Sequence, residues 1–131
     1  MVHTTRLRVG FVGSGFIARF QATAMRQVRG IELAGVYSPN RAAAFAAFAK
    51  DLGVGTPVCY GSVTELAKHV DCIAIFAPNF LHVPIMEEIA AAVAGGAELK
   101  GVICEKPLGR NVAEARRLVE LAESAGLLIL H

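Results

Sequence analysis

The stretch Leu7–Ala18, with the sequence LRVGFVGSGFIA, joins an apolar segment of strand length to a helical segment through a glycine turn. Gly13 allows the chain to turn sharply, Gly15 lets the backbone come close to a ligand, and Ala18 lets the helix pack tightly on a sheet. The amino terminus of a helix attracts anions, because its first N–H groups are unpaired and its dipole is positive there. This strand, turn and helix therefore predict a site for the phosphates of a dinucleotide.

Composition excludes several other classes of protein. The chain has 131 residues, 54% hydrophobic and 18% charged, which indicates one domain with a substantial core and argues against disorder. The formal net charge is +2 and the basic residues are scattered among acidic ones, so nucleic acid is not an expected partner. The longest run without Asp, Glu, Lys or Arg covers residues 72–86, shorter than the roughly 20 residues of a membrane helix.

The three cysteines, Cys59, Cys72 and Cys104, lie far apart within apolar segments. An odd number at these spacings suggests neither a disulfide framework nor a zinc cluster, and no metal site is predicted. Together with the absence of a membrane segment, this pattern predicts a reduced, cytoplasmic protein.

Apolar runs of strand length alternate with segments of helical periodicity along the chain. Strands are expected near residues 7–13, 31–38, 57–60, 71–77, 101–105 and 127–131. Helices are expected near residues 16–28, 40–52, 62–69, 82–94 and 111–125. This alternation is typical of the α/β class and predicts a Rossmann-type, doubly wound parallel sheet of about six strands with helices on both faces.

Two of these helices carry a capping pattern at their start, in which Ser62 precedes Glu65 and Asn111 precedes Glu114 by three residues. Apolar side chains at helical spacing predict the inward face of the last helix. They are Val112, Ala115, Leu118, Val119 and Ala122.

The sequence ends on an apolar strand, residues 127–131, with no polar tail. The termini of complete domains usually lie frayed at the surface. We therefore expect residues 1–131 to form the amino-terminal domain of a longer, two-domain enzyme, with the carboxy-terminal substrate domain absent from this chain.

Ligands of a doubly wound sheet bind beyond the carboxyl ends of the strands, near the point where the strand order reverses. The first and fourth strands should be neighbours there, with the fifth beside the fourth. Residues 13–18, 38–41, 77–80 and 105–107 directly follow strands and should converge on one crevice.

The residues after the second strand bear on the choice of cofactor. An acidic residue there would bind the ribose and repel a 2′-phosphate, whereas this chain has Ser38, Pro39, Asn40 and Arg41. Because a hydroxyl and a guanidinium both donate to phosphate, NADP is favoured over NAD. Arg41 could equally be a solvated surface arginine. Glu32 begins the strand and should lie at the opposite edge.

Lys106 is the best candidate for chemistry, because an ammonium just beyond a strand can hold a substrate hydroxyl and pass a proton. A surface lysine in a turn is the alternative. Pro78 and Asn79 could shape the cofactor pocket or form an ordinary turn. His82 could cap its helix, reach the crevice or be a structural histidine. Cys104, next to Glu105, could be a reactive thiol, but its place inside a buried strand favours a small buried hydrophobe.

Three motifs together resemble one family: VGFVGSGFIA at residues 9–18, APNFLH at 77–82 and EKPL at 105–108. They are similar to the nucleotide-binding half of the Gfo/Idh/MocA family, which includes glucose-fructose oxidoreductase and inositol dehydrogenase. The resemblance covers essentially the whole chain and implies NAD(P)-dependent oxidoreduction of a sugar, cyclitol or related small molecule. It also implies that Lys106 contacts the reacting hydroxyl and that Glu105 and Pro107 place it against the nicotinamide. Family members continue into a substrate domain that supplies much of an oligomer interface, so a homo-oligomer is also implied.

The residues expected to bind the cofactor are Gly13, Gly15, Phe16, Ile17, Ala18, Ser38, Asn40, Arg41, Ala77, Pro78, Asn79, His82, Glu105, Lys106 and Pro107, with Lys106 also catalytic. One alternative function is a non-catalytic dinucleotide-binding or interaction module, such as a truncated relative that pairs through its exposed last strand. Another is a relative that uses the cofactor for elimination or glycoside cleavage.

Overall fold

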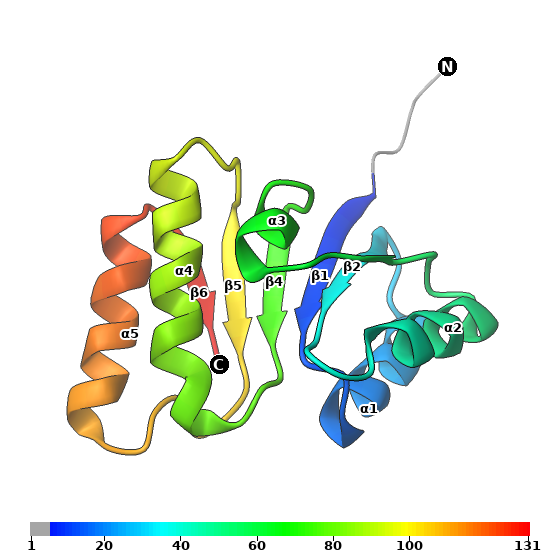
Figure 1. Cartoon of the computed structure of the whole chain (residues 1–131), viewed down its shortest axis with the longest axis horizontal. Coiled ribbons are helices and arrows are strands. Elements are labelled where there is room, and N and C mark those ends of the chain that lie inside the picture. Colours follow the sequence, from blue (N-terminus) through cyan, green and yellow to red (C-terminus); the bar gives the residue numbers. More distant parts are fainter. Residues whose placement is uncertain (1–5) are drawn as a thin grey trace.

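A computed structural model describes residues 6–131 and contains a six-stranded sheet whose strands are all parallel, in the order β3-β2-β1-β4-β5-β6. The strands are β1 (Leu7–Val12), β2 (Ile31–Tyr37), β3 (Val58–Cys59), β4 (Cys72–Ile75), β5 (Gly101–Cys104) and β6 (Leu128–Leu130). The helices are α1 (Phe16–Ala24), α2 (Ala42–Leu52), α3 (Val63–Ala67), α4 (His82–Ala94) and α5 (Val112–Ser124). Figure 1 shows their arrangement and confirms the predicted doubly wound fold.

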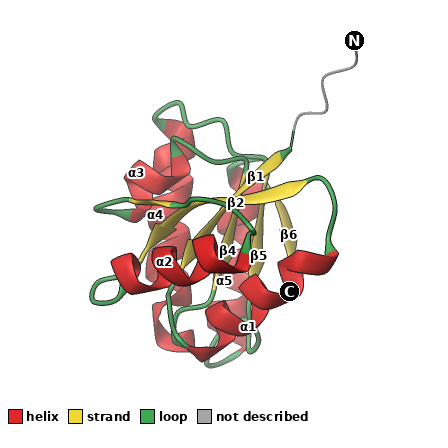
Figure 2. Ribbon diagram, turned by 90° about the vertical axis from the view of Figure 1, so that its right-hand side faces the viewer, coloured by secondary structure: helices red, strands yellow, loops and turns green. Residues whose placement is uncertain are grey.

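Helices cover both faces of the sheet, as Figure 2 shows in a view turned by 90°. Under α3, α4 and α5, one buried cluster includes Leu66, Ile73 and Leu118; under α1 and α2, a second includes Phe11 and Phe45. The strand order places β1 beside β4, so the chain reverses direction across the sheet between them. The predicted point of reversal is therefore confirmed.

The capping patterns are present as predicted. Ser62 Oγ accepts from the Glu65 amide at 3.0 Å, and Asn111 Oδ1 accepts from the Glu114 amide at 2.9 Å. Each bond satisfies an amide that the first turn of the helix would otherwise leave unpaired.

Some expected elements are shorter than the sequence pattern indicates. The α-helix expected over residues 16–28 ends at Ala24 and continues as a 3₁₀ turn, η1 (Met25–Gln27), and a second 3₁₀ turn, η2 (Asn79–Leu81), precedes α4. The strand expected near residues 57–60 shrinks to two exposed residues at the sheet edge, so Cys59 is exposed rather than enclosed in an apolar segment. An edge strand pairs on one side only, so less holds it in register.

The predicted inward face of the last helix is partly wrong. Leu118, Leu121 and Ala122 are buried, whereas the Val112 side chain is 67% exposed. Val112 is the first residue of α5 and lines a shallow surface groove with Leu108 and Ala115. Periodicity gives the spacing of apolar side chains, but what packs against each turn of a helix decides its burial.

Gly55 is a position that no side chain can occupy without strain. Its φ is +150°, and a Cβ there would lie 2.2 Å from the Leu33 carbonyl oxygen. We expect Gly55→Ala to lower the free energy of unfolding by about 2 kcal/mol. Urea denaturation measures this, with Gly61→Ala as control, because a Cβ at Gly61 meets nothing within 4 Å. Equal midpoints for the two variants would contradict the expectation.

Candidate functional site

The four loops predicted to converge do line one cavity of about 980 Å³ at the carboxyl ends of the strands. This volume is at the upper end of the range for small-molecule sites, roughly 300–1,000 Å³. The lining residues from these loops are Gly13, Ser14, Gly15, Phe16, Ile17, Ser38, Pro39, Asn40, Arg41, Ala77, Pro78, Asn79, Glu105, Lys106 and Pro107. Ala18 does not line the cavity but is fully buried against the sheet.

The glycine turn forms the centre of this cavity. Gly13 has a φ of +110°, and a Cβ there would lie 3.0 Å from the carbonyl group of Phe76, so the turn packs directly on the end of β4. Gly15 differs, because a Cβ there would meet nothing within 4 Å and would extend into open space. Gly15 lines the cavity, so this space is available to a ligand.

Helix α1 presents its amino terminus to the same place. Gly15 is its N-cap and offers no side-chain hydrogen bond, and the first turn contains no acidic residue. The first N–H groups of α1 are therefore free of a protein cap and can donate to an anion. The open space at Gly15 and these donors together fit a diphosphate group.

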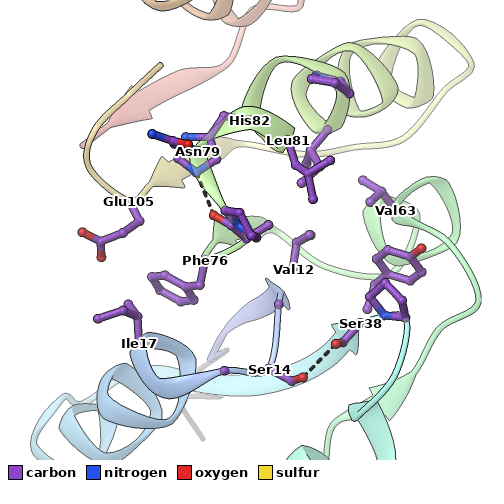
Figure 3. Close-up of a pocket in the computed structure, with 18 of the residues that line it drawn as sticks. Val12, Ser14, Ile17, Ser38, Val63, Phe76, Asn79, Leu81, His82 and Glu105 are labelled. Carbon is purple, nitrogen blue, oxygen red and sulfur yellow. Dashed lines mark hydrogen bonds between the residues drawn. The ribbon is translucent and has the colours of Figure 1, made fainter. Parts of the chain in front are cut away.

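The loop after β2 lies beside the glycine turn and is tied to it by one hydrogen bond. Ser14 Oγ and Ser38 Oγ are 2.7 Å apart (Figure 3). One hydroxyl donates to the other, so the remaining hydroxyl hydrogen can serve a ligand. Asn40 and Arg41 are exposed at the same rim.

Among the described residues, the part of the cavity wall that follows β2 contains no acidic side chain. The acidic residues of the wall, Glu88 and Glu105, come from other segments of the chain. Glu32 lies at the start of β2, where its carboxylate is 3.5 Å from Arg8 Nη1, so its predicted place at the opposite edge is confirmed. The rim after β2 thus presents hydroxyl, amide and guanidinium groups.

Lys106 lies on the other side of the cavity, after β5. Glu105 Oε1 accepts from the Lys106 backbone amide at 3.0 Å, and the Lys106–Pro107 peptide bond is cis. The Lys106 side chain is exposed and makes none of the ion pairs found among the described residues. Its ammonium group is therefore available to a ligand in the cavity.

His82 is 1% exposed, and each ring nitrogen lies at hydrogen-bonding distance from a backbone carbonyl oxygen. Nε2 lies 3.0 Å from the Ala77 carbonyl oxygen, and Nδ1 lies 3.0 Å from that of Leu108. Leu81 is the N-cap residue of α4, so His82 does not cap this helix. Since a carbonyl oxygen only accepts, a ring with one N–H donates to one of these two oxygens, and a ring with two donates to both. His82 is a buried structural histidine whose ring also borders the cavity (Figure 3).

Cys104 lies beside His82, with its Sγ 3.3 Å from Nδ1. Burial raises the pKa of the Cys104 thiol to about 12, with a smaller contribution from the negative charge of Glu105. Cys104 is 1% exposed, which supports its interpretation as a small buried hydrophobe rather than a nucleophile.

Cys59 and Cys104 should therefore differ in reactivity. We expect iodoacetamide at pH 8 to alkylate exposed Cys59 and to leave Cys104 unmodified in the folded protein, as peptide mass spectrometry would show. Equal alkylation of both cysteines would contradict this expectation.

Since burial raises the pKa of Cys104 in the folded protein from 9.0 to about 12, its contribution to the free energy of unfolding is complete below pH 9 and is lost as the pH rises toward 12.

Several lining residues were missed by the sequence reasoning. Val12, Tyr37 and Phe76 directly precede predicted loops, so their positions carried a usable signal. The other missed residues belong to α3, to α4 or to the turn η2 before α4: Val63, Leu81, Pro84, Ile85 and Glu88. Glu88 Oε2 accepts from the backbone amide and the hydroxyl of Thr64, which draws α4 and α3 together at this wall.

None of the helices in residues 6–131 combines the length and apolarity needed to cross a membrane. Within the same range, no three His, Cys, Asp or Glu side chains are grouped as metal ligands would be.

A parallel sheet with a glycine turn, an open helix amino terminus and a cavity at the point of reversal defines a dinucleotide-binding domain. Comparison with known families agrees, because the oxidoreductase family with an NAD-binding Rossmann fold matches residues 7–131. The chain belongs to this family, Gfo/Idh/MocA, and is an NAD-binding oxidoreductase domain.

Curated relatives include glucose-6-phosphate 3-dehydrogenase of Bacillus subtilis, 34% identical over 88% of this chain and 30% of the relative. Another is 1,5-anhydro-D-fructose reductase of Ensifer adhaerens, 34% identical over 93% of this chain and 34% of the relative. This chain thus spans about a third of their length.

Solved structures show the same fold. UDP-N-acetylglucosamine 3-dehydrogenase of Acidithiobacillus ferrooxidans superposes with a TM-score of 0.74 at 28% identity, covering 95% of this chain and 38% of that one. Biliverdin reductase of Synechocystis, solved with biliverdin and NADP+, superposes with a TM-score of 0.71 at 29% identity, covering 95% of this chain and 37% of that one.

Proposed function

We propose that this domain binds NADP and serves in hydride transfer at a hydroxyl or carbonyl carbon of a sugar, cyclitol or related small molecule. The observation that carries the proposal is that one cavity contains both the anion site at Gly15 and the ammonium-bearing Lys106. The names of relatives that oxidise glucose 6-phosphate or a UDP-sugar support this substrate class.

The order of the strands supports a division of the cavity between the parts of the cofactor. The diphosphate lies at Gly13 and Gly15 and receives hydrogen bonds from the first amides of α1, including those of Phe16 and Ile17. The loops after β2 and β5 are three strand spacings apart, roughly 14 Å, which separates the two halves of the cofactor.

The adenosine half lies on the β2 side, where Ser38, Asn40 and Arg41 meet the ribose and its 2′-phosphate. The apolar side chain of Val63, which lies beside Ser38 (Figure 3), lines the same part of the wall and would accommodate the base.

The nicotinamide half lies on the β4 and β5 side. The residues that shape its pocket are Ala77, Pro78, Asn79, His82, Glu105 and Pro107. When bound there, nicotinamide takes up or supplies the hydride. Lys106 donates a hydrogen bond to the substrate oxygen and exchanges a proton with it, which lowers the barrier to forming or removing the carbonyl group.

The substrate would require more protein than this chain contains. Since the chain spans about a third of its curated relatives, we propose that it is the amino-terminal domain of a longer, two-domain enzyme. The second domain would complete the substrate pocket over Lys106. On its own, the chain is then expected to bind the cofactor better than it turns over a substrate.

The cofactor preference can be tested by fluorescence titration of this chain with NADPH and NADH. We expect NADPH to bind at least about tenfold more tightly, because the rim after β2 offers donors and lacks a carboxylate. Ser38→Asp should reverse the preference, since a carboxylate repels a 2′-phosphate and binds ribose hydroxyls. Thr23→Ser, outside the cavity, is the control. Tighter binding of NADH by the wild type would overturn the preference.

A non-catalytic interaction module is a second candidate, favoured by strand β6 at the sheet edge. Its Leu128 and Leu130 side chains are 68% and 56% exposed, and an exposed edge can pair with another chain. Sedimentation velocity over a range of concentrations would support this function if dimers formed and no cofactor bound. A monomer that binds NADPH would exclude it.

A further inference from the structure

We propose that His82 is a positioning residue that fixes the loop carrying Lys106 to the loop carrying Pro78 and Asn79. Its contact to the β4–α4 loop is Nε2 to the Ala77 oxygen, and its contact to the β5–α5 loop is Nδ1 to the Leu108 oxygen, both 3.0 Å. The role given to Lys106 rests on the proposed function, whereas the bridge between the two loops rests on the contacts of the His82 ring alone.

The two loops share few polar contacts. They belong to different crossover connections of the sheet. Among the described residues, one hydrogen bond joins residues 76–82 to residues 106–110, and it is the contact between His82 Nδ1 and the Leu108 oxygen. The ladder between β4 and β5 ends with the Glu105 amide donating to the Ile75 oxygen at 3.0 Å, before either loop begins. Beyond that point, Ala77 and Leu108 also pack against the core cluster under α3, α4 and α5, and the ring supplies the polar link between the two loops.

The bridge is well placed to control Lys106. Leu108 follows Lys106 by two residues, and the ring reaches it from the first turn of α4, a helix fixed in the core by Met86 and Ile89. Cys104 also contacts the ring, with its Sγ 3.3 Å from the same Nδ1 that faces the Leu108 oxygen. A buried ring with three contacts has little freedom to change rotamer, so its two carbonyl partners stay at a fixed distance.

Amide hydrogen exchange of the cofactor-free chain tests the bridge. In His82→Phe, which keeps a ring but has no donor, we expect amides in residues 77–81 and 106–110 to exchange about tenfold faster, while those of β4 stay unchanged. His82→Gln retains one donor and should give an intermediate rate. His69→Phe is the matched control, because its Nδ1 contacts only the Glu65 oxygen within its own segment, at 2.8 Å.

A second readout separates positioning from general support of the fold. Because His82 lines the nicotinamide pocket, the Kd for NADPH should rise in both His82 variants, whereas that of His69→Phe should equal the wild-type value. The emission of bound NADPH, which reports on the surroundings of nicotinamide, should change in His82→Phe and recover partly in His82→Gln.

Wild-type exchange in residues 106–110 of both variants would overturn the bridge, as would a uniform rise that includes β4. Should His82→Phe fail to fold, the same criteria apply to His82→Gln. Failure of the wild type to bind NADPH would contradict the proposed function, whereas the exchange result in the cofactor-free chain would still decide the bridge.

Discussion

Gly15→Val is expected to weaken NADPH binding by at least about a hundredfold while leaving the fold intact. The added side chain meets no atom of the protein within 4 Å of its Cβ, so the domain tolerates it. It would instead fill the space from which a diphosphate reaches the first amides of α1. Fluorescence titration measures the affinity, and thermal unfolding checks the fold.

Two matched glycine variants make this result specific. Gly61→Val also adds a side chain in open space, but outside the cavity, and should bind NADPH as the wild type does. Gly13→Ala lies in the same turn at a φ of +110°, so it should lose stability as well as affinity. Wild-type affinity in Gly15→Val would contradict the assignment of the diphosphate site.

Lys106→Met is expected to lower kcat by about 10²–10⁴-fold in an enzyme preparation that contains the substrate-binding part. Methionine keeps the length and apolar stem of lysine but cannot donate a hydrogen bond or exchange a proton. The Kd for NADPH should stay within about threefold, because the adenosine and diphosphate contacts remain. Steady-state kinetics, with the direct titration alongside, measures both quantities.

The matched control is Lys100→Met, which removes another exposed lysine, located before β5 and 4.0 Å from Asp71. Its kcat should equal that of the wild type. An unchanged kcat in Lys106→Met would exclude Lys106 as the catalytic residue and would favour a purely cofactor-binding role for this domain.

The fold could be predicted because local signals agreed with one another. The alternation of apolar and helical segments predicted a parallel sheet of six strands, and the glycine turn at Gly13–Gly15 predicted where the first crossover begins. Since the carboxyl ends of parallel strands share one edge, four loops could be placed at one cavity before their distances were known.

What could not be predicted depends on contacts between distant segments. Nothing in the sequence indicates that the Leu33 carbonyl oxygen occupies the space where a side chain at position 55 would lie, so that Gly55 is required there. The wall formed by Val63 and Ile85 depends on how α3 approaches α4. His82 left three interpretations open, because the partners that decide between them are backbone oxygens, one of them 26 residues away.

A crystal structure of this chain with NADP+ tests the central claim most directly. Our account predicts the diphosphate within hydrogen-bonding distance of the first amides of α1 at Gly15, the 2′-phosphate near Ser38 and Arg41, and nicotinamide beside Lys106. A diphosphate bound away from Gly15, or nicotinamide on the β2 side of the cavity, would contradict it.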